Sequence, residues 1–159
     1  MEYHQIEPVY DKNSKILILG SFPSVKSRET GFFYGHPQNR FWKIVAAVFE
    51  EDVPATIEEK KKMLLRNGIA LWDVAASCEI DGSADSSIRN VRPNDIKKLI
   101  SETSISRIYV NGRTALKLYQ KYLEEQLGME AIVLPSTSPA NAAYSLVILI
   151  DAWRIIKGN

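Results

Sequence analysis

The stretch "KILILGSFPSVKSRETGFFYGHPQNRFW", residues 15–42, joins an apolar run to a long loop and then to a helix. The run 15–20 is too short for a helix and has the composition of a strand buried on both faces. The loop after it is rich in glycine, proline and aromatic side chains. Loops of that length are uncommon inside a compact domain and are more often functional than idle. We therefore expect a buried strand whose carboxyl end opens into a binding loop.

Three further short apolar runs are expected to form strands, with amphipathic segments between them. The predicted strands are 15–20, 69–74, 106–111 and 130–134. The predicted helices are 39–50, 56–67, 94–101, 112–126 and 141–157. Strands that alternate with helices indicate a parallel sheet covered on both faces. The sequence thus predicts one α/β domain over residues 1–159, a three-layer α/β/α sandwich with a four-stranded, mostly parallel sheet.

The composition is ordinary for a globular protein, and the formal net charge of +1 at pH 7 is small. Such a charge argues against a protein that coats nucleic acid by phosphate neutralisation alone. The N-terminal segment is too polar for a signal peptide and no apolar run suits a membrane helix, so we expect a cytoplasmic protein without a membrane partner. Cys78 is the single cysteine, which excludes an intramolecular disulfide and an all-cysteine iron–sulfur cluster. We expect no metal and no other cofactor.

The predicted sheet also indicates where a ligand would bind. In open parallel sheets, ligands bind beyond the carboxyl ends of the strands. The segments that leave those ends are 20–38, 73–93, 111–113 and 134–141. The first, second and fourth have the composition of loops. We expect these loops to form a binding cleft.

The first loop offers aromatic rings and an amide. Phe32, Phe33 and Tyr34 lie between two glycines. An exposed ring there suits stacking on a nucleobase, which is worth about 1–3 kcal/mol per base. We expect two of the three rings to pack beneath the loop and one to face the ligand. Asn39 begins the next helix, where its side chain suits a helix cap and, through its carbonyl, a bound water molecule.

The last loop, "LPSTSPANAAY" from residue 134, brings small polar side chains to the start of the final helix. Ser136, Thr137, Ser138 and Asn141, together with backbone N–H groups, suit a DNA phosphate. A plain helix cap by Ser138 or Asn141 is an equal alternative. Arg40 is equally suited to a phosphate and to solvent.

These two motifs resemble the uracil-DNA glycosylase superfamily. The run "GSFPS…TGFFYGHPQNRFW" resembles GINPG…GFPFAHPANRFW of its mismatch-specific branch, and the close match covers about residues 15–49. Residues 132–141 resemble the second motif, HPS or NPS, more weakly. The serine of "GSFPS" and the asparagine of "HPQNRFW" are most similar to the hypoxanthine-DNA glycosylase branch.

The resemblance implies base excision repair by a monofunctional enzyme. Such an enzyme flips a deaminated nucleotide, here most simply deoxyinosine, out of double- or single-stranded DNA and hydrolyses its N-glycosidic bond. The lone Cys78 separates this chain from the iron–sulfur branches of the superfamily, and a monomer is the default expectation for a one-domain repair enzyme. Relatives carry Asp, Asn or Glu where this chain has Ser21, whose hydroxyl is a poor general base. Asn39 is therefore implied as the group that orients water. No lysine of these loops is placed to form a Schiff base.

The resemblance also implies roles for other side chains of the cleft. Tyr34 matches the ring that stacks on the flipped base, with Phe33 as a substitute, and Ser136 matches a serine that holds a phosphate. Asp73 lies near a base-reading asparagine of relatives, and its carboxylate suits the N1–H of hypoxanthine as well as a plain loop role. No bulky side chain follows Ser136 directly, so another residue must invade the duplex. The expected site residues are Asn39 and Ser21 (catalytic), Tyr34, Phe33, Phe22 and Asp73 (base-binding), Ser136, Ser138, Asn141 and Arg40 (DNA-binding), and Gly20, Pro23 and Ser24 (motif backbone).

Two alternatives remain open. The same fold can act on uracil or on a mismatched pyrimidine, although Ser21 in place of an acid argues against strong uracil activity. The chain can also be a non-catalytic module that binds damaged bases. Replacement of Asn39 distinguishes catalysis from binding.

Overall fold

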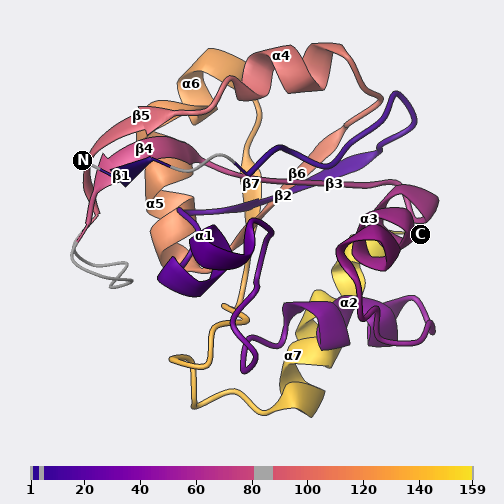
Figure 1. Cartoon of the computed structure of the whole chain (residues 1–159). Coiled ribbons are helices and arrows are strands. Elements are labelled where there is room, and N and C mark those ends of the chain that lie inside the picture. Colours follow the sequence, from indigo (N-terminus) through magenta and orange to yellow (C-terminus); the bar gives the residue numbers. More distant parts are fainter. Residues whose placement is uncertain (1, 4–5, 81–87, 159) are drawn as a thin grey trace.

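A four-stranded parallel sheet forms the centre of the computed structural model, which describes residues 2–3, 6–80 and 88–158 (Figure 1). The strands are β2 (Ile16–Gly20), β3 (Ile69–Asp73), β6 (Arg107–Asn111) and β7 (Ala131–Leu134). Their order is β3-β2-β6-β7, and all three pairings are parallel. Each predicted strand is present within one residue of its expected bounds. The predicted α/β fold with a four-stranded parallel sheet is confirmed.

Helices cover both faces of this sheet (Figure 1). Those on one face are α2 (Phe41–Val48), α3 (Ile57–Arg66) and α7 (Leu146–Trp153). Those on the other are α4 (Ile96–Ser101), α5 (Arg113–Tyr122) and α6 (Glu124–Leu127). Side chains of β2 alternate between the two apolar clusters, with Ile16 and Ile18 in the first and Leu17 and Leu19 in the second. A strand with two buried faces must be apolar throughout, which explains the run that opens the sequence motif.

The last two predicted helices differ from expectation. The segment 141–157 becomes helical only at Leu146, because Ser145 caps α7 by accepting a hydrogen bond from the N–H of Ile148. It ends in a short 3₁₀ helix, η2 (Arg154–Lys157). The segment 112–126 is divided into α5 and α6 at Leu123. The cap by Ser145 explains the late start of α7, because local capping overrides the apolar period at a helix end.

The segment 73–93, expected to be a loop, contains two strands of a second sheet. β4 (Ala75–Glu79) pairs antiparallel with β1 (Glu2–Tyr3) and with β5 (Arg89–Pro93). β5 is largely exposed and ends in proline, so it has no apolar alternation to indicate a strand. Residues 81–87 of this segment lie outside the described residues.

A short helix also lies within the first loop. It is α1 (Val25–Thr30), which Ser24 caps by accepting a hydrogen bond from the N–H of Ser27 at 3.1 Å. Gly31 ends it with a φ of 77°. Six residues are too few for a visible apolar period, so this helix could not be predicted from the sequence. In the described part of the chain, no helix is both long enough and apolar enough to span a bilayer.

Candidate functional site

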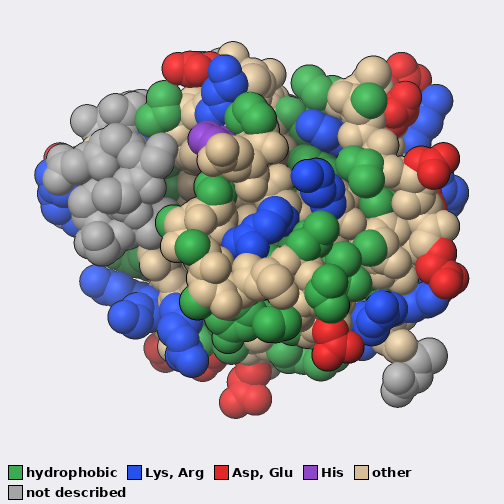
Figure 2. Space-filling view, turned by 90° about the horizontal axis from the view of Figure 1, so that it is seen from below, with side chains coloured by type: hydrophobic (Ala, Val, Ile, Leu, Met, Phe, Trp, Pro, Cys, Tyr) green, Lys and Arg blue, Asp and Glu red, His purple; other side chains and the backbone are tan. Residues whose placement is uncertain are grey.

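A cleft of about 1050 Å³ lies beyond the carboxyl ends of the four parallel strands. It is lined by all of the expected site residues except Arg40. The two loops that form most of its wall are the first loop, residues 21–40, and the second loop, residues 135–145. Figure 2 views the molecule from the side of these loops and shows Lys and Arg side chains across the middle of the face, with acidic ones mostly at its edges. This distribution suits a ligand that carries negative charge.

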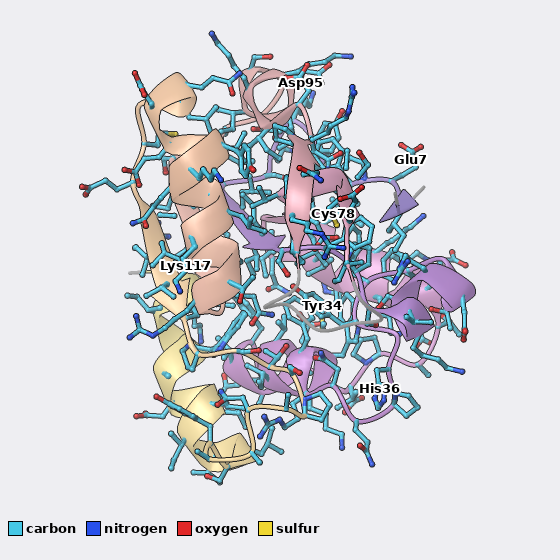
Figure 3. The ribbon with its side chains drawn as sticks, turned by 90° about the vertical axis from the view of Figure 1, so that its left-hand side faces the viewer. Glu7, Tyr34, His36, Cys78, Asp95 and Lys117 are labelled. Atoms are coloured by element: carbon cyan, nitrogen blue, oxygen red, sulfur yellow. The ribbon has the colours of Figure 1, made fainter. Side chains whose placement is uncertain are left out.

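Tyr34 presents the most accessible ring of the "FFY" run to a ligand in the cleft. Phe32 and Phe33 are only 4% and 2% exposed, whereas Tyr34 is half-buried. The ring of Tyr34 stacks on Phe41, with centroids 4.2 Å apart and an interplanar angle of 18°. Figure 3 shows Tyr34 between the sheet and α2. The geometry favours Tyr34 over Phe33 as a stacking surface.

The backbone of Tyr34 has a conformation unusual for a residue with a side chain. Its φ is 53°, in the left-handed region that non-glycine residues seldom adopt. Such strain costs of the order of 1–3 kcal/mol and persists where the surroundings enforce it. In this conformation the ring of Tyr34 stacks on Phe41.

Gly20 and Asp73 form the floor of the cleft. The two residues are opposite each other in the pairing of β2 with β3. A β carbon at Gly20 would collide with Asp73 Oδ1 and would lie 3.1 Å from the Tyr34 hydroxyl oxygen, so only glycine fits. Asp73 is 4% exposed and Ser21, the next residue along the floor, is 8% exposed. A buried carboxylate thus lies next to the stacking ring.

The other residues of the first motif shape the loop. Phe22 is 6% exposed and packs with Ala75 and Cys78 of the second sheet. Pro23 is buried, and Ser24 caps α1. Base contact by Phe22 stays a prediction, while the structural role of the motif backbone is visible in these contacts.

The amide of Asn39 is held in one orientation by two hydrogen bonds. Its Oδ1 accepts from the backbone N–H of Phe41 at 3.0 Å and from the hydroxyl of Thr137 at 2.8 Å. A backbone N–H can only donate, so the atom facing it must be the oxygen. Both acceptor positions of Oδ1 are then taken. This geometry does not favour a water on the carbonyl, and that role stays a prediction. The group left for the cleft is the Nδ2 amide NH2, which makes no hydrogen bond within the described residues.

Asn111, which sequence reasoning did not assign, and Thr137, which it placed among the hydroxyl groups suited to a phosphate, complete this network. Thr137 is fully buried, and its Oγ1 accepts a hydrogen bond from Asn111 Nδ2 at 3.1 Å. Its backbone N–H donates to Asn111 Oδ1 at 3.1 Å. The one signal in the sequence is that Asn111 is polar and ends a buried strand, where ligand-site residues gather. The chain of contacts Asn111–Thr137–Asn39 links β6 to both loops.

Arg40 holds the second loop together instead of lining the cleft. Its Nη1 donates to the carbonyl of Tyr144, and its Nη2 donates to the carbonyls of Ser138 at 2.9 Å and Asn141 at 3.0 Å. Its backbone N–H also donates to the carbonyl of Thr137 at 3.1 Å. The guanidinium is thus occupied by backbone oxygens. A DNA contact by Arg40 stays a prediction that this geometry does not favour.

The small polar side chains of the second loop bind their own backbone. Ser136 Oγ accepts from the N–H of Ser138 at 3.1 Å, and Ser138 Oγ accepts from the N–H of Ala140 at 3.1 Å. Asn141 Nδ2 donates to the carbonyl of Ser136 at 3.0 Å. Neither Ser138 nor Asn141 caps the last helix, so that alternative is wrong. Within the described chain both serine hydroxyls keep their proton free to donate, and their phosphate role stays a prediction.

The cleft therefore combines the ring of Tyr34, the buried carboxylate of Asp73, the amide NH2 of Asn39 and the hydroxyl groups of two serines, Ser136 and Ser138. Among the residues described, no three His, Cys, Asp or Glu side chains are grouped so that they could hold a metal ion. These groups can stack on a base, accept one hydrogen bond from it, and donate hydrogen bonds to water or phosphate. This combination of groups suits a nucleotide.

Comparison with known proteins agrees with this chemistry. A model of the uracil DNA glycosylase superfamily matches residues 7–155. A protein of Methanosarcina acetivorans named hypoxanthine DNA glycosylase is 40% identical over 141 residues, which cover 86% of this chain and 87% of that protein. One of the same name from Methanosarcina barkeri is 32% identical over 143 residues, 89% of each chain.

A solved structure is similar over nearly the whole chain. It is an NMR solution structure of a Methanosarcina acetivorans protein provisionally named a uracil DNA glycosylase, with a TM-score of 0.80 and 35% identity. The likeness covers 97% of this chain and 98% of that one. The resemblance read from the two motifs is thereby confirmed: this chain belongs to the uracil DNA glycosylase superfamily.

Proposed function

We propose that this protein is a monofunctional DNA glycosylase of base excision repair that releases hypoxanthine from deoxyinosine and works as a monomer. The hypoxanthine DNA glycosylases of two Methanosarcina species support the substrate, since they are 40% and 32% identical to this chain. The observation that supports it most is the fixed amide of Asn39. Its carbonyl oxygen accepts both hydrogen bonds, which leaves its NH2 group for the cleft that Tyr34 also lines.

The floor of the cleft fits the edge of hypoxanthine. In the proposed complex the flipped base stacks on Tyr34, and its N1–H donates to the carboxylate of Asp73. Adenine has a bare acceptor nitrogen at N1 and would face the carboxylate with like polarity. Tyr34 and Asp73 would therefore distinguish hypoxanthine from adenine. Because uracil also has a ring N–H, Asp73 alone does not reject it.

Hydrolysis needs a placed water more than a strong base. Water adds to C1′ of the deoxyribose as the bond from C1′ to N9 breaks, and the electron pair of that bond leaves with hypoxanthine. The departing base takes up a proton from solvent, and the added water releases one of its protons to solvent, which leaves a hydroxyl on C1′. We propose that the amide NH2 group of Asn39 donates a hydrogen bond to the oxygen of this water and holds the water beside C1′. Ser21 lacks the basicity to remove a proton from that water. Positioning and stabilisation of developing charge then supply the rate enhancement.

The chain offers no buried amine for strand cleavage in this cleft. Lys26 is the lysine in the described cleft wall, and its exposed ammonium lies 4.0 Å from the carboxylate of Glu29 on the surface. A lysine that attacks a sugar as a free amine is usually desolvated. We therefore propose that the product is an intact strand with an abasic site.

A direct assay tests this function. The purified protein is incubated without metal with end-labelled duplexes that contain deoxyinosine or deoxyuridine, and abasic sites are then cleaved with alkali. We expect a break at deoxyinosine only, and only after alkali. A break without alkali would contradict the monofunctional mechanism.

Uracil excision is the second candidate, favoured by the solved structure of 35% identity that is provisionally named a uracil DNA glycosylase. Cleavage at deoxyuridine in the same assay would support it and would overturn the interpretation of Ser21. Binding of lesion DNA without release of either base would instead identify a non-catalytic module.

A further inference from the structure

Helix α5 carries three cations and no acidic side chain. The cations are Arg113, Lys117 and Lys121, which are spaced four residues apart and are all exposed. Side chains four residues apart lie on the same face of a helix, so the three form one stripe, here called the α5 stripe. None of them has an ion-pair partner among the described residues. Uncompensated positive charge is therefore concentrated on one face of this helix.

This pattern of charges opposes the stability of the helix. A cation in the first turn faces the positive end of the helix macrodipole, and like charges four residues apart repel each other. In α3, by contrast, Glu58 lies in the first turn and Arg66 in the last, and Lys62 Nζ lies 3.1 Å from Glu58 Oε1. α5 has Arg113 in its first turn and no acidic residue at all. A pattern that costs helix stability indicates that the charges serve another purpose.

The α5 stripe begins at the cleft. Arg113 lines the cleft and follows the carboxyl end of β6 by two residues. The helix then carries Lys117 and Lys121 away from the cleft in steps of about 6 Å, because a helix rises about 1.5 Å per residue. Figure 3 views the molecule from the side on which α5 and Lys117 lie, and Tyr34 is labelled in the same view. The stripe thus leads from the cleft onto the surface beside it.

Other cations near the cleft differ from the α5 stripe, because they have acidic partners. Lys26 lines the cleft, and its Nζ lies 4.0 Å from the carboxylate of Glu29. Arg89 pairs in register with Glu79, and its Nε lies 3.6 Å from that carboxylate. A phosphate would compete with these carboxylates for the cation. The two lysines of α5 offer positive charge without such competition.

We propose that Lys117 and Lys121 bind phosphates of one DNA strand, on one side of the flipped nucleotide only. The inference rests on the proposed function. Duplex DNA carries one phosphate per about 3.4 Å of axis on each strand, so the roughly 12 Å from Arg113 to Lys121 spans about three or four phosphates. A lysine ammonium binds a phosphate as a point charge. The α5 stripe therefore extends the contact with DNA beyond the cleft, and it recognises the backbone and not the base sequence.

The first experiment measures DNA binding as a function of salt concentration. Lys117→Gln/Lys121→Gln removes both lysine charges and keeps Arg113 in the cleft wall. Binding to a dye-labelled duplex with one deoxyinosine is measured by fluorescence anisotropy at several salt concentrations. Each phosphate contact contributes about 0.9 to the slope of log K against log salt, so the slope of the double variant should be shallower by about two. The control Lys12→Gln/Lys15→Gln removes the same charge just before β2, at the edge of the sheet opposite the cleft, and should keep the wild-type slope.

A second experiment uses two duplexes that carry deoxyinosine near one end. In one the long arm lies on the 5′ side of the lesion, and in the other it lies on the 3′ side. Because α5 leaves the cleft in one direction, the double variant should bind one of these duplexes as tightly as wild type does and the other more weakly. Equal losses on both would indicate long-range attraction without defined contacts and would overturn the proposal. A wild-type slope for the double variant, or an equal change of slope in the control, would also overturn it.

Catalysis and folding give independent readouts. With protein in excess and binding saturated, the double variant should release hypoxanthine at the wild-type rate. Its midpoint of thermal unfolding should be equal or higher, because a pair of like charges has been removed. A slower rate at saturation would place the lysines in the chemistry, and a lower midpoint would give them a structural role; either result would contradict the proposal.

The same measurements separate this inference from the proposed function. If wild-type protein binds the duplex but releases no hypoxanthine, the proposed function fails, while the salt slopes still report whether α5 contacts DNA.

Discussion

The two loops of the cleft are held in place by different forces. The first loop buries the rings of Phe22, Phe32 and Phe33, and Trp42 Nε1 donates to the Phe33 carbonyl at 3.2 Å. In the second loop only Thr137 is buried, and hydrogen bonds from Arg40 and Asn111 fix its course. A polar group buried among apolar side chains costs free energy unless it has a hydrogen-bond partner. The second loop is built from polar groups near the surface, so some of its hydrogen-bond donors can face the cleft. The first loop is thus suited to present a surface and the second to present hydrogen-bond donors.

The two kinds of loop meet at the contact between Asn39 and Thr137. The proposed reactive amide lies at this boundary and takes its orientation from both sides. Substitutions on each side test whether the division holds.

The largest effect is expected on stability from the first loop. Phe32→Ala removes a ring that is 4% exposed. Its centroid lies 5.4 Å from that of Phe33, in an edge-on arrangement, and 5.9 Å from that of Trp42, in a stacked one. The free energy of unfolding should fall by about 3–5 kcal/mol in urea denaturation. Ser138→Ala, the matched change in the second loop, should change it by less than about 0.5 kcal/mol. Similar losses for the two variants would contradict the comparison.

The largest effect on activity is expected from Asn39. Asn39→Ala should slow base release about 10²- to 10³-fold, as the loss of one preorganised donor does in other enzymes. Asn39→Asp is the sharper variant, since it keeps acceptors for Phe41 and Thr137 but has no N–H to donate. We expect it to match wild type in thermal unfolding and to lose release in single-turnover assays. Full activity in either variant would remove Asn39 from the mechanism.

A smaller effect is expected from Tyr34. Tyr34→Ala removes the ring stacked on Phe41 and should weaken transition-state binding by about 1–3 kcal/mol, measured as kcat/KM for deoxyinosine DNA. Tyr34→Phe keeps the ring and should stay close to wild type. If Phe33→Leu, a change beneath the loop, lowers kcat/KM more than Tyr34→Ala, the stacking surface has been assigned to the wrong ring.

The smallest effect is expected from Thr137. Thr137→Val keeps the shape but removes the hydroxyl between Asn39 and Asn111, and should lower the free energy of unfolding by about 1 kcal/mol. Base release should also slow, because the amide is held by one hydrogen bond instead of two. In a double-mutant cycle with Asn39→Ala the two losses in rate should not add. Additive losses would show that the hydroxyl acts independently of the amide.

The central sheet could be predicted because strands buried on both faces leave short apolar runs in the sequence. The second sheet could not, since β5 is mostly exposed and β4 pairs with the distant β1. In the site, the ring of Tyr34 could be anticipated from its neighbours. The orientation of the Asn39 amide could not, because it depends on Thr137, 98 residues later. The role of Arg40 could not be predicted either, because its partners are backbone carbonyls and every residue type has one.

The partners of Arg40 lie 98, 101 and 104 residues farther along the chain. Proteins are made from the N-terminus, so the ribosome finishes the first loop long before it reaches Tyr144. Until then Asn39 lacks its bond from Thr137, Arg40 lacks its carbonyl partners, and the second wall of the cleft does not exist. A partly synthesised chain therefore contains the motif of residues 20–42 but cannot form the cleft, because the second loop is still missing. Competence to act on DNA arises in one late step of synthesis.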